Sequence, residues 1–217
     1  MDLRASECNP SNGPLVLIGA SGFGREILWV CRRAGLAVIG FCDDAAERQS
    51  GAFCGLPLLG TIEQTAAQRG PGIRFHVAVG DNRARQRLAA RALAAGWAPL
   101  ALVDPSAIVA SDAMIEPGAY VGIYSIVSSA SRVGPFALVN HHVTVGHDVT
   151  LGACVQLCPG VRVSGACVLE EGALLGSNAV TLPGCRMGAW STLGAGAVAA
   201  RDVAAGTSQV RLPARQA

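Results

Sequence analysis

Aromatic and charged residues are scarce in this sequence. Phe, Tyr and Trp make up 5% of the 217 residues and charged residues 15%, and 17 basic against 15 acidic side chains leave a net charge of only +2. Because Lys and Arg form no run, the chain lacks the basic patch that binding to a phosphate backbone requires. We therefore expect no nucleic-acid partner.

The eight cysteines lack the CxxC pairs that are typical of zinc ribbons and redox motifs. Several lie within apolar patterns, where a reduced thiol acts as a small hydrophobic side chain. The opening stretch is polar and has no apolar signal core, and uncharged stretches such as residues 117–131 are too short and glycine-rich to span a bilayer. We expect a cytoplasmic protein with no membrane partner, in which residues 1–13 are disordered or extended.

What the sequence does have is a period of six. Every sixth residue from Val103 to Leu193 is Val, Ile, Leu or Met except Thr181, and a second column of small or β-branched residues follows each of these by four positions. A period of six fits neither a helix nor a flat strand, whereas a coil of short strands turns one large and one small side chain inward per hexad. We predict a parallel β-helix of about five coils over residues 101–217, with a C-terminal tail.

Residues 14–100 alternate instead between strand and helix patterns. The segments PLVLIG, AVIGFCDD and RFHVAVGDN are typical of buried strands, and FGREILWVCRRAGL and RARQRLAARALAAG are typical of helices. This order predicts a small α/β domain with a parallel sheet. We expect the boundary between the two domains around residues 97–104.

One loop of this first domain is rich in glycine. GASGFG, residues 19–24, lies between a strand and a helix, where backbone N–H groups at a helix N-terminus can hold an anion. Its glycine spacing differs from the dinucleotide fingerprint. A nucleotide-binding turn and a merely tight turn are equally compatible with it.

Two further loops follow predicted strands. Asp43 and Asp44 stand where a carboxylate can meet a base or a ribose, although a solvated acidic loop explains them as well. Asp81 or Asn82 can cap the next helix, and that cap is a sufficient explanation for their presence. All three loops are expected at the carboxyl ends of their strands, where open α/β sheets bind ligands.

Three of the four histidines lie in VNHHVTVGHDVTLG, residues 139–152. His141, His142 and His147 fall outside both inward columns and are expected to face outward. An isolated histidine is most often a plain surface residue, but three imidazoles beside Asp148, on a surface with few other titratable groups, favour a functional site.

A family resemblance is carried, in order, by LVLIGASGFGREI, FCDD, AVGDNRARQRL, VNHHVTVGHDVTLG, CVQLCPG, LLGSNAVTLPG and LPAR. Nearly the whole chain from residue 14 resembles the sialic acid O-acetyltransferase and bacillosamine-type N-acetyltransferase family of sugar acyltransferases. This resemblance implies a Rossmann-like domain over residues 14–100 that binds a nucleotide-linked sugar, and a left-handed β-helix that binds acetyl-CoA. It also implies a homotrimer with its active sites between neighbouring helices.

The reaction implied by the resemblance is acetyl transfer to an amino group of the sugar, or else to a hydroxyl group, in polysaccharide biosynthesis and without a metal. His147 would be the general base and Asp148 its partner, since a carboxylate stabilises the imidazolium that forms. The Gly165 N–H would face the thioester oxygen. The other implied sugar-nucleotide contacts are Gly19, Ser21, Gly22, Asp43, Asp44, Asn82, Asn140 and His141, and the implied coenzyme contacts are Gln156, Gly165 and Ala179.

Some positions depart from the family pattern. Gln156 stands where a histidine is common, and Phe23 replaces a histidine of the glycine turn. Arg211 and Leu212 replace a Gly-Asn pair before the terminal PAR. These departures fall at positions implied in sugar recognition and coenzyme packing, and none of them changes His147.

Two other classes of protein share such a scaffold. γ-Type carbonic anhydrases hold zinc with three histidines, and the spacing of His142 and His147 suits them, but Gly152 stands where a further histidine is expected. A non-catalytic solenoid that organises partners is compatible with the repeats alone. The grouping of Asn140, His147 and Asp148, together with the nucleotide-binding loops, favours catalysis over such a solenoid.

Overall fold

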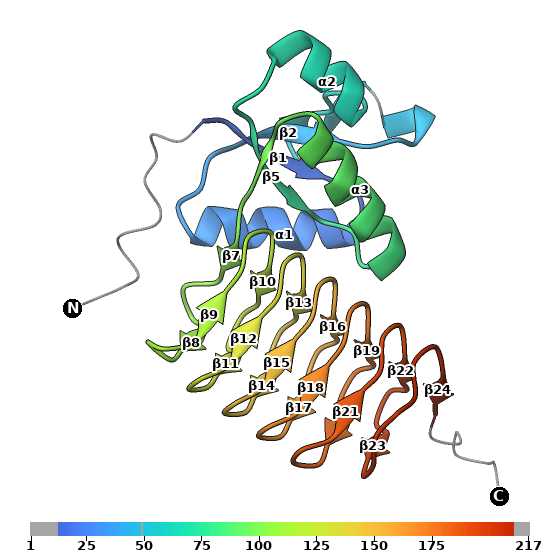
Figure 1. Ribbon diagram of the computed structural model, residues 1–217. Helices are drawn as coiled ribbons and strands as arrows, with labels where there is room; N and C mark the ends of the chain where they lie inside the picture. The colour runs from blue at the N-terminus through green and yellow to red at the C-terminus, as the bar shows by residue number, and fades with distance from the viewer. Residues whose placement is uncertain (1–12, 49, 211–217) are drawn as a thin grey trace, which may run out of the picture. The chain divides into compact units, whose positions relative to one another are not determined.

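The computed structural model describes residues 13–48 and 50–210, which fall into two compact units that divide after Pro105 (Figure 1). The extended or disordered start predicted for residues 1–13 lies outside the described residues except for Gly13, and so do Arg211 and Leu212. In the described part of the chain, no helix has the length and apolar character needed to cross a membrane.

The first unit is built on a four-stranded parallel sheet in the order β2-β1-β5-β6. Its strands are β1 (Leu15–Ile18), β2 (Val38–Cys42), β5 (Arg74–Val77) and β6 (Ala98–Pro99). All four residues of β1 are buried, as expected of a parallel strand that is covered on both faces. The predicted alternation of strands and helices is confirmed.

The helices of this unit are α1 (Gly22–Arg33), α2 (Ile62–Arg69) and α3 (Asn82–Ala94), with a short 3-10 turn η1 (Ala46–Arg48) and an antiparallel hairpin of β3 (Ala52–Phe53) and β4 (Leu56–Pro57). Asp81 caps α3 by accepting a hydrogen bond from the N–H of Ala84 (2.7 Å), which confirms one of the two caps considered. Helix α2 begins with a capping box of Thr61 and Gln64. Helix α2 and the hairpin were not predicted from the sequence.

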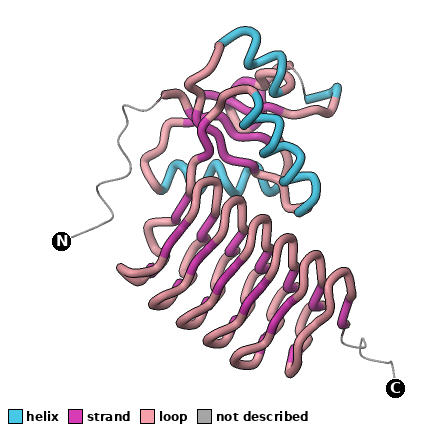
Figure 2. Tube along the Cα trace, in the orientation of Figure 1, coloured by secondary structure: helices cyan, strands magenta, loops and turns pink. Residues whose placement is uncertain are grey.

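The solenoid consists of three parallel sheets made of two-residue strands (Figure 2), and its first strand, β7 (Leu102–Val103), precedes the division after Pro105. The first sheet contains β7, β10 (Tyr120–Val121), β13 (Leu138–Val139), β16 (Gln156–Leu157), β19 (Leu174–Leu175), β22 (Thr192–Leu193) and β24 (Ser208–Gln209). The second contains β8 (Ile108–Val109), β11 (Ile126–Val127), β14 (Thr144–Val145), β17 (Arg162–Val163), β20 (Val180–Thr181) and β23 (Val198–Ala199). The third contains β9 (Met114–Ile115), β12 (Arg132–Val133), β15 (Thr150–Leu151), β18 (Val168–Leu169) and β21 (Arg186–Met187).

The register confirms the predicted coil. Val127 pairs with Val145, and Val145 pairs with Val163, so each coil contains three hexads. Both predicted columns point inward: Val145 and the small-column residue Val143, for example, are fully buried. The coil count was too low, because the solenoid continues beyond Leu193 through β24.

Candidate functional site

The predicted general base forms a pair with its neighbour in the sequence. His147 and Asp148 lie in the turn that follows β14, and Nδ1 of the imidazole is 2.7 Å from Oδ2 of the carboxylate. Their side chains are 68% and 61% exposed. A carboxylate bound at Nδ1 favours the tautomer in which Nε2 can accept a proton. The pair therefore presents a base toward solvent.

The backbone of this turn is left-handed at Asp148, as it is at the equivalent turn residues Ala130 and Ala166. Asp148 has a φ of +57°, a left-handed conformation that Asp and Asn adopt more readily than most other residues. This conformation turns the chain between the second and third sheets and lets the carboxylate fold back onto the preceding imidazole.

Gly165 lies against the His147 ring from the next coil. A Cβ added at Gly165 would stand 2.5 Å from Nε2 of His147 and 2.6 Å from its Cε1. Only glycine leaves room for the ring at this position. The structure thus brings together three of the predicted site residues: His147, Asp148 and Gly165.

Asn140, His141 and His142 lie in the turn that precedes β14, so the two histidine-bearing turns stand at the two ends of one short strand. Asn140 Oδ1 accepts a hydrogen bond from the N–H of His141 (2.7 Å). His142 is exposed, as His147 is, and this confirms the outward direction predicted for both. His141 is half-buried, with its ring edge-on to Tyr120 (centroids 6.4 Å apart).

The other residues predicted to contact the coenzyme lie elsewhere on the solenoid. Gln156 is half-buried in β16 of the first sheet, with Nε2 3.8 Å from Cys158 Sγ. Ala179 is fully buried in the small inward column, so only its backbone is available to a ligand. In the part of the chain that the structure describes, no group of three or more His, Cys, Asp or Glu side chains is arranged to hold a metal ion.

In the first unit, the glycine turn is held by Asp43. The N–H of Ala20 donates to Asp43 Oδ2 (2.8 Å), and Gly19 has a φ of +110°. Ser21 precedes α1 as its N-cap but makes no side-chain capping bond. The Asp43 carboxylate therefore shapes the turn in addition to any contact with a ligand.

A cavity of about 110 Å³ opens at the carboxyl ends of β1 and β2, and Gly19, Asp43, Asp44 and Val79 are among the residues that line it. In the sheet β1 has β2 on one side and β5, which follows later in the chain, on the other. Such a switch point in strand order is where open α/β sheets bind ligands. Ser21, Gly22 and Asn82 are not among its lining residues.

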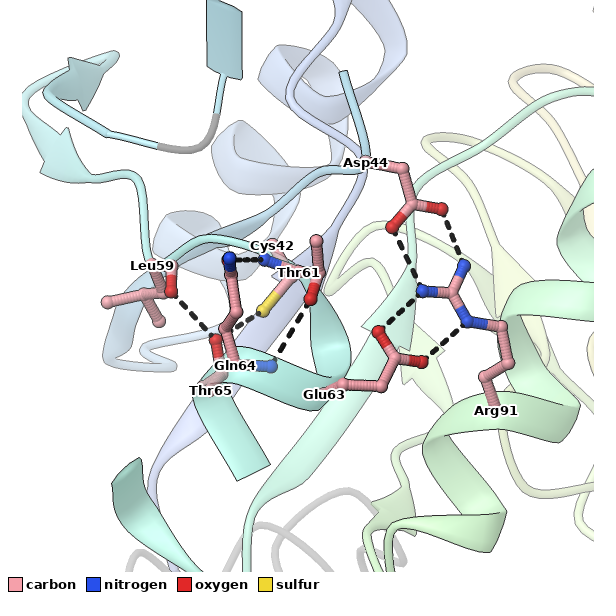
Figure 3. A network of polar contacts seen from close by, with 8 residues as sticks. All are labelled: Cys42, Asp44, Leu59, Thr61, Glu63, Gln64, Thr65 and Arg91. Carbon is pink, nitrogen blue, oxygen red and sulfur yellow. Dashed lines mark hydrogen bonds and ion pairs between the residues drawn. The ribbon is translucent and has the colours of Figure 1, made fainter. Parts of the chain in front are cut away.

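Asp44 is engaged by a residue that the sequence analysis missed (Figure 3). Arg91 of α3 donates to both oxygens of Asp44 (2.5 and 3.0 Å) and to both oxygens of Glu63 (2.8 and 2.7 Å). These hydrogen bonds lower the pKa of Glu63 to about 2. Since the partners are far apart in the sequence, no local pattern signals this network.

Asn82 is likewise held inside the unit. Its Oδ1 accepts from the guanidinium of Arg85 (3.0 Å), and both residues are buried. Arg85 also donates to the carbonyls of Val79 (3.1 Å) and Gly80 (2.8 Å). Arg85, another residue not singled out from the sequence, thus fixes the loop that follows β5.

Comparison with known proteins agrees with this architecture. Residues 14–92 match the family described as the PglD N-terminal domain. GDP-perosamine N-acetyltransferase of Escherichia coli O157:H7 is 32% identical over 110 residues, which cover 51% of this chain and 50% of that protein. The chain thus spans about half the length of this curated relative in the alignment.

Two solved structures match almost throughout. A histidine-to-asparagine mutant of perosamine N-acetyltransferase from Caulobacter crescentus, in complex with CoA and GDP-perosamine, is 30% identical with a TM-score of 0.86, covering 94% of this chain and 96% of its own. The acetyltransferase domain of PglB from Neisseria gonorrhoeae FA1090, in complex with acetyl coenzyme A, is 30% identical with a TM-score of 0.85, covering 94% and 98%. These matches confirm a left-handed β-helix acyltransferase fold. The chain belongs to the bacillosamine- and perosamine-type sugar N-acetyltransferase family.

Proposed function

We propose that the protein transfers an acetyl group from acetyl-CoA to an amino group of a nucleotide-linked amino sugar. The observation that carries this proposal is the exposed His147–Asp148 pair resting on Gly165, in a chain whose relatives hold CoA together with GDP-perosamine. A positioned imidazole of this kind is the usual base for such a transfer.

In this mechanism the amine nitrogen attacks the thioester carbon while Nε2 of His147 takes its proton. Asp148 holds Nδ1 and stabilises the imidazolium. The N–H of Gly165 donates to the oxyanion that develops on the carbonyl oxygen. When the tetrahedral intermediate collapses, the carbon–sulfur bond breaks and the CoA thiolate leaves with the proton that His147 returns.

The nucleotide would bind in the first unit. The cavity beside Gly19, Asp43 and Asp44 stands at a topological switch point, and the adjoining start of α1 offers N–H groups to a phosphate. Asn140 and His141, in the turn before β14, would contact the sugar. GDP-perosamine is the first acceptor to test, because it is the sugar nucleotide found in the relatives.

A homotrimer would complete the site. Outward residues of the second solenoid sheet include the apolar side chains of Ile108 (60% exposed), Ile126 (39%) and Val198 (56%) together with Arg162. The third sheet presents Met114 beside Arg132 and Arg186. Exposed apolar surface favours a contact with another chain, and closed symmetry is the usual outcome for identical copies. Strand β14, between the two histidine-bearing turns, belongs to the second sheet. Light scattering that shows a stable monomer would contradict the trimer.

The direct test follows thiol release from acetyl-CoA against GDP-perosamine, against other nucleotide-linked amino sugars and against their hydroxyl counterparts. Turnover with an amino sugar supports N-acetyl transfer and identifies the nucleotide. Turnover only with a hydroxyl sugar would show that the protein transfers the acetyl group to oxygen instead of nitrogen. Absence of both turnover and coenzyme binding, with stoichiometric zinc in the purified protein, would favour the carbonic anhydrase alternative.

A further inference from the structure

Most turns of the solenoid are closed by one direct backbone hydrogen bond. In these turns the N–H of the fourth residue donates to the carbonyl oxygen of the first. Ala137 donates to Gly134 (3.2 Å), Ala173 to Glu170 (3.1 Å) and Ser191 to Gly188 (3.1 Å) in this way. Such a turn has little freedom to vary, because the bond fixes the distance between its ends.

The turn that carries His147 and Asp148 is built differently. Ser131, one coil below, donates its hydroxyl to the carbonyl of Gly146 (2.6 Å) and accepts from the N–H of Val149 (3.2 Å). The other acceptor within reach, the carbonyl of Ser129, is farther away at 3.3 Å. The hydroxyl therefore stands between the two backbone groups that bond directly to each other in most other turns.

The turn that carries Asn140, His141 and His142 repeats this arrangement. Ser125 donates to the carbonyl of Asn140 (2.6 Å) and accepts from the N–H of Val143 (3.0 Å). Ser125 and Ser131 are both buried members of the small inward column. Two core hydroxyls thus open the two turns that hold the predicted base and the predicted sugar contacts.

The turn that begins at Ser164 and contains Gly165 is also held by a core hydroxyl, from the coil above. The N–H of Ser164 donates to Oγ1 of Thr181 (3.3 Å), and Oγ1 lies 3.3 Å from Cys167 Sγ. In the equivalent place one coil below, the N–H of Gly146 donates to the carbonyl of Val163 (2.8 Å). Thr181 is the residue that breaks the apolar column, and it stands beside the turn that faces His147.

We propose that Ser131 is a positioning residue for acetyl transfer, and that Ser125 does the same for the sugar-binding turn. The Ser131 hydroxyl holds the turn of residues 146–149 open, and so sets where His147 and Asp148 stand relative to Gly165. Without it, the carbonyl of Gly146 and the N–H of Val149 would bond directly and draw the imidazole away from its place. This inference rests on the proposed function.

The test compares Ser131→Ala with Ser191→Ala. Ser191 is a buried serine of the same column, and its hydroxyl has no hydrogen-bond partner among the described residues, so it controls for the loss of an oxygen from the core. Ser131→Ala is expected to lower kcat by about 10- to 100-fold, since small misplacements of a catalytic group cost this much. KM for acetyl-CoA should stay unchanged, and Ser191→Ala should match the wild type. Equal kcat values for the two variants would overturn the proposal.

A second pair of variants separates the hydroxyl from packing. The column already holds valines at Val143, Val149, Val155 and Val161, so it accepts β-branched side chains. Ser131→Thr keeps the hydroxyl and Ser131→Val has the same shape without it. We expect Ser131→Thr to retain most of the wild-type kcat and Ser131→Val to lose it as Ser131→Ala does. This pair decides the matter if Ser131→Ala does not fold, and equal kcat values for Thr and Val would again overturn the proposal.

A crystal structure of Ser131→Ala, or of Ser131→Val in its place, provides a readout that does not depend on turnover. The Gly146 carbonyl and the Val149 N–H should then be directly bonded, with the His147 ring displaced from Gly165. An unchanged turn would overturn the positioning role. If the wild-type protein acetylates no sugar, the proposed function fails by itself, and the structure of the variant still decides whether Ser131 shapes the turn.

Discussion

The two units use polar residues in opposite ways. In the first unit, the acidic and amide residues near the cavity are tied to other parts of the unit: Asp43 to the glycine turn, Asp44 to Arg91 and Asn82 to Arg85. In the solenoid, His142 and His147 face solvent, and buried hydroxyls support the turns that carry them. We infer that the first unit uses its polar groups mainly to keep the shape of a binding site, whereas the solenoid presents groups that react.

Replacement of His147 tests this contrast most strongly. His147→Ala removes the proposed general base, so we expect kcat to fall by roughly 10²- to 10⁴-fold, the range of general-base contributions. Coenzyme and sugar nucleotide should still bind, because the substitution leaves the other predicted contact residues in place. Steady-state kinetics and calorimetric binding of CoA measure the two effects.

His142→Ala serves as the matched control, because His142 is an exposed histidine at the other end of β14. It should retain turnover. Full activity in His147→Ala together with a large loss in His142→Ala would move the base to the other turn.

Gly165→Ala should have the next largest effect. Its added methyl would stand 2.5 Å from the His147 ring, so the imidazole must move. A misplacement of a catalytic group by about 1 Å lowers kcat by about 100-fold. Because the ring is exposed and free to swing into solvent, the melting temperature should change little. A normal kcat would show that the contact between His147 and Gly165 is not needed for the reaction.

The repeat explains why so much of the solenoid was predictable. The same inward pattern recurs in every hexad, so the inward columns and the outward direction of His147 follow from counting positions alone. The support from Ser131 could not be seen in the same way, because the spacing of the hexads does not show that a buried hydroxyl bonds the backbone of the next coil.

The first unit has no such redundancy. Helix α2 has only eight residues, of which Ile62 and Thr65 are buried, and this is too few for a helical period to emerge. The partners of Arg91 lie on other segments of the chain, so their pairing is a property of the folded unit. Here the sequence predicts the elements that are long or strongly apolar and misses the polar network between them.

Buried His76 makes the stability of the first unit depend on pH. Burial lowers the pKa of His76 from 6.5 to about 4, while its Nδ1 bonds the carbonyl of Leu100 (3.1 Å). As the pH falls below 6.5, His76 becomes protonated in the unfolded chain but stays neutral in the folded chain. The free energy of unfolding therefore decreases as the pH falls from 6.5 toward 4. We expect a loss of about 2 kcal/mol between pH 7 and pH 5.

Urea unfolding at several pH values between 5 and 7 measures how steeply the free energy of unfolding changes with pH. His76→Gln should flatten this slope, whatever the variant does to stability at pH 7. The same slope in both proteins would show that the pH dependence arises elsewhere.

The smallest effect should come from Arg91, although it makes the most conspicuous ion pairs of the first unit (Figure 3). The side chains of Asp44 and Glu63 are 49% and 60% exposed, and pairs screened by water contribute less than about 1 kcal/mol each. Arg91→Gln should therefore destabilise the protein only slightly, and 1 M salt should remove most of the difference from the wild type. A larger loss that salt does not alter would show that Arg91 acts through packing of α3 against the sheet, and the first unit would then depend on this residue as the solenoid depends on its core.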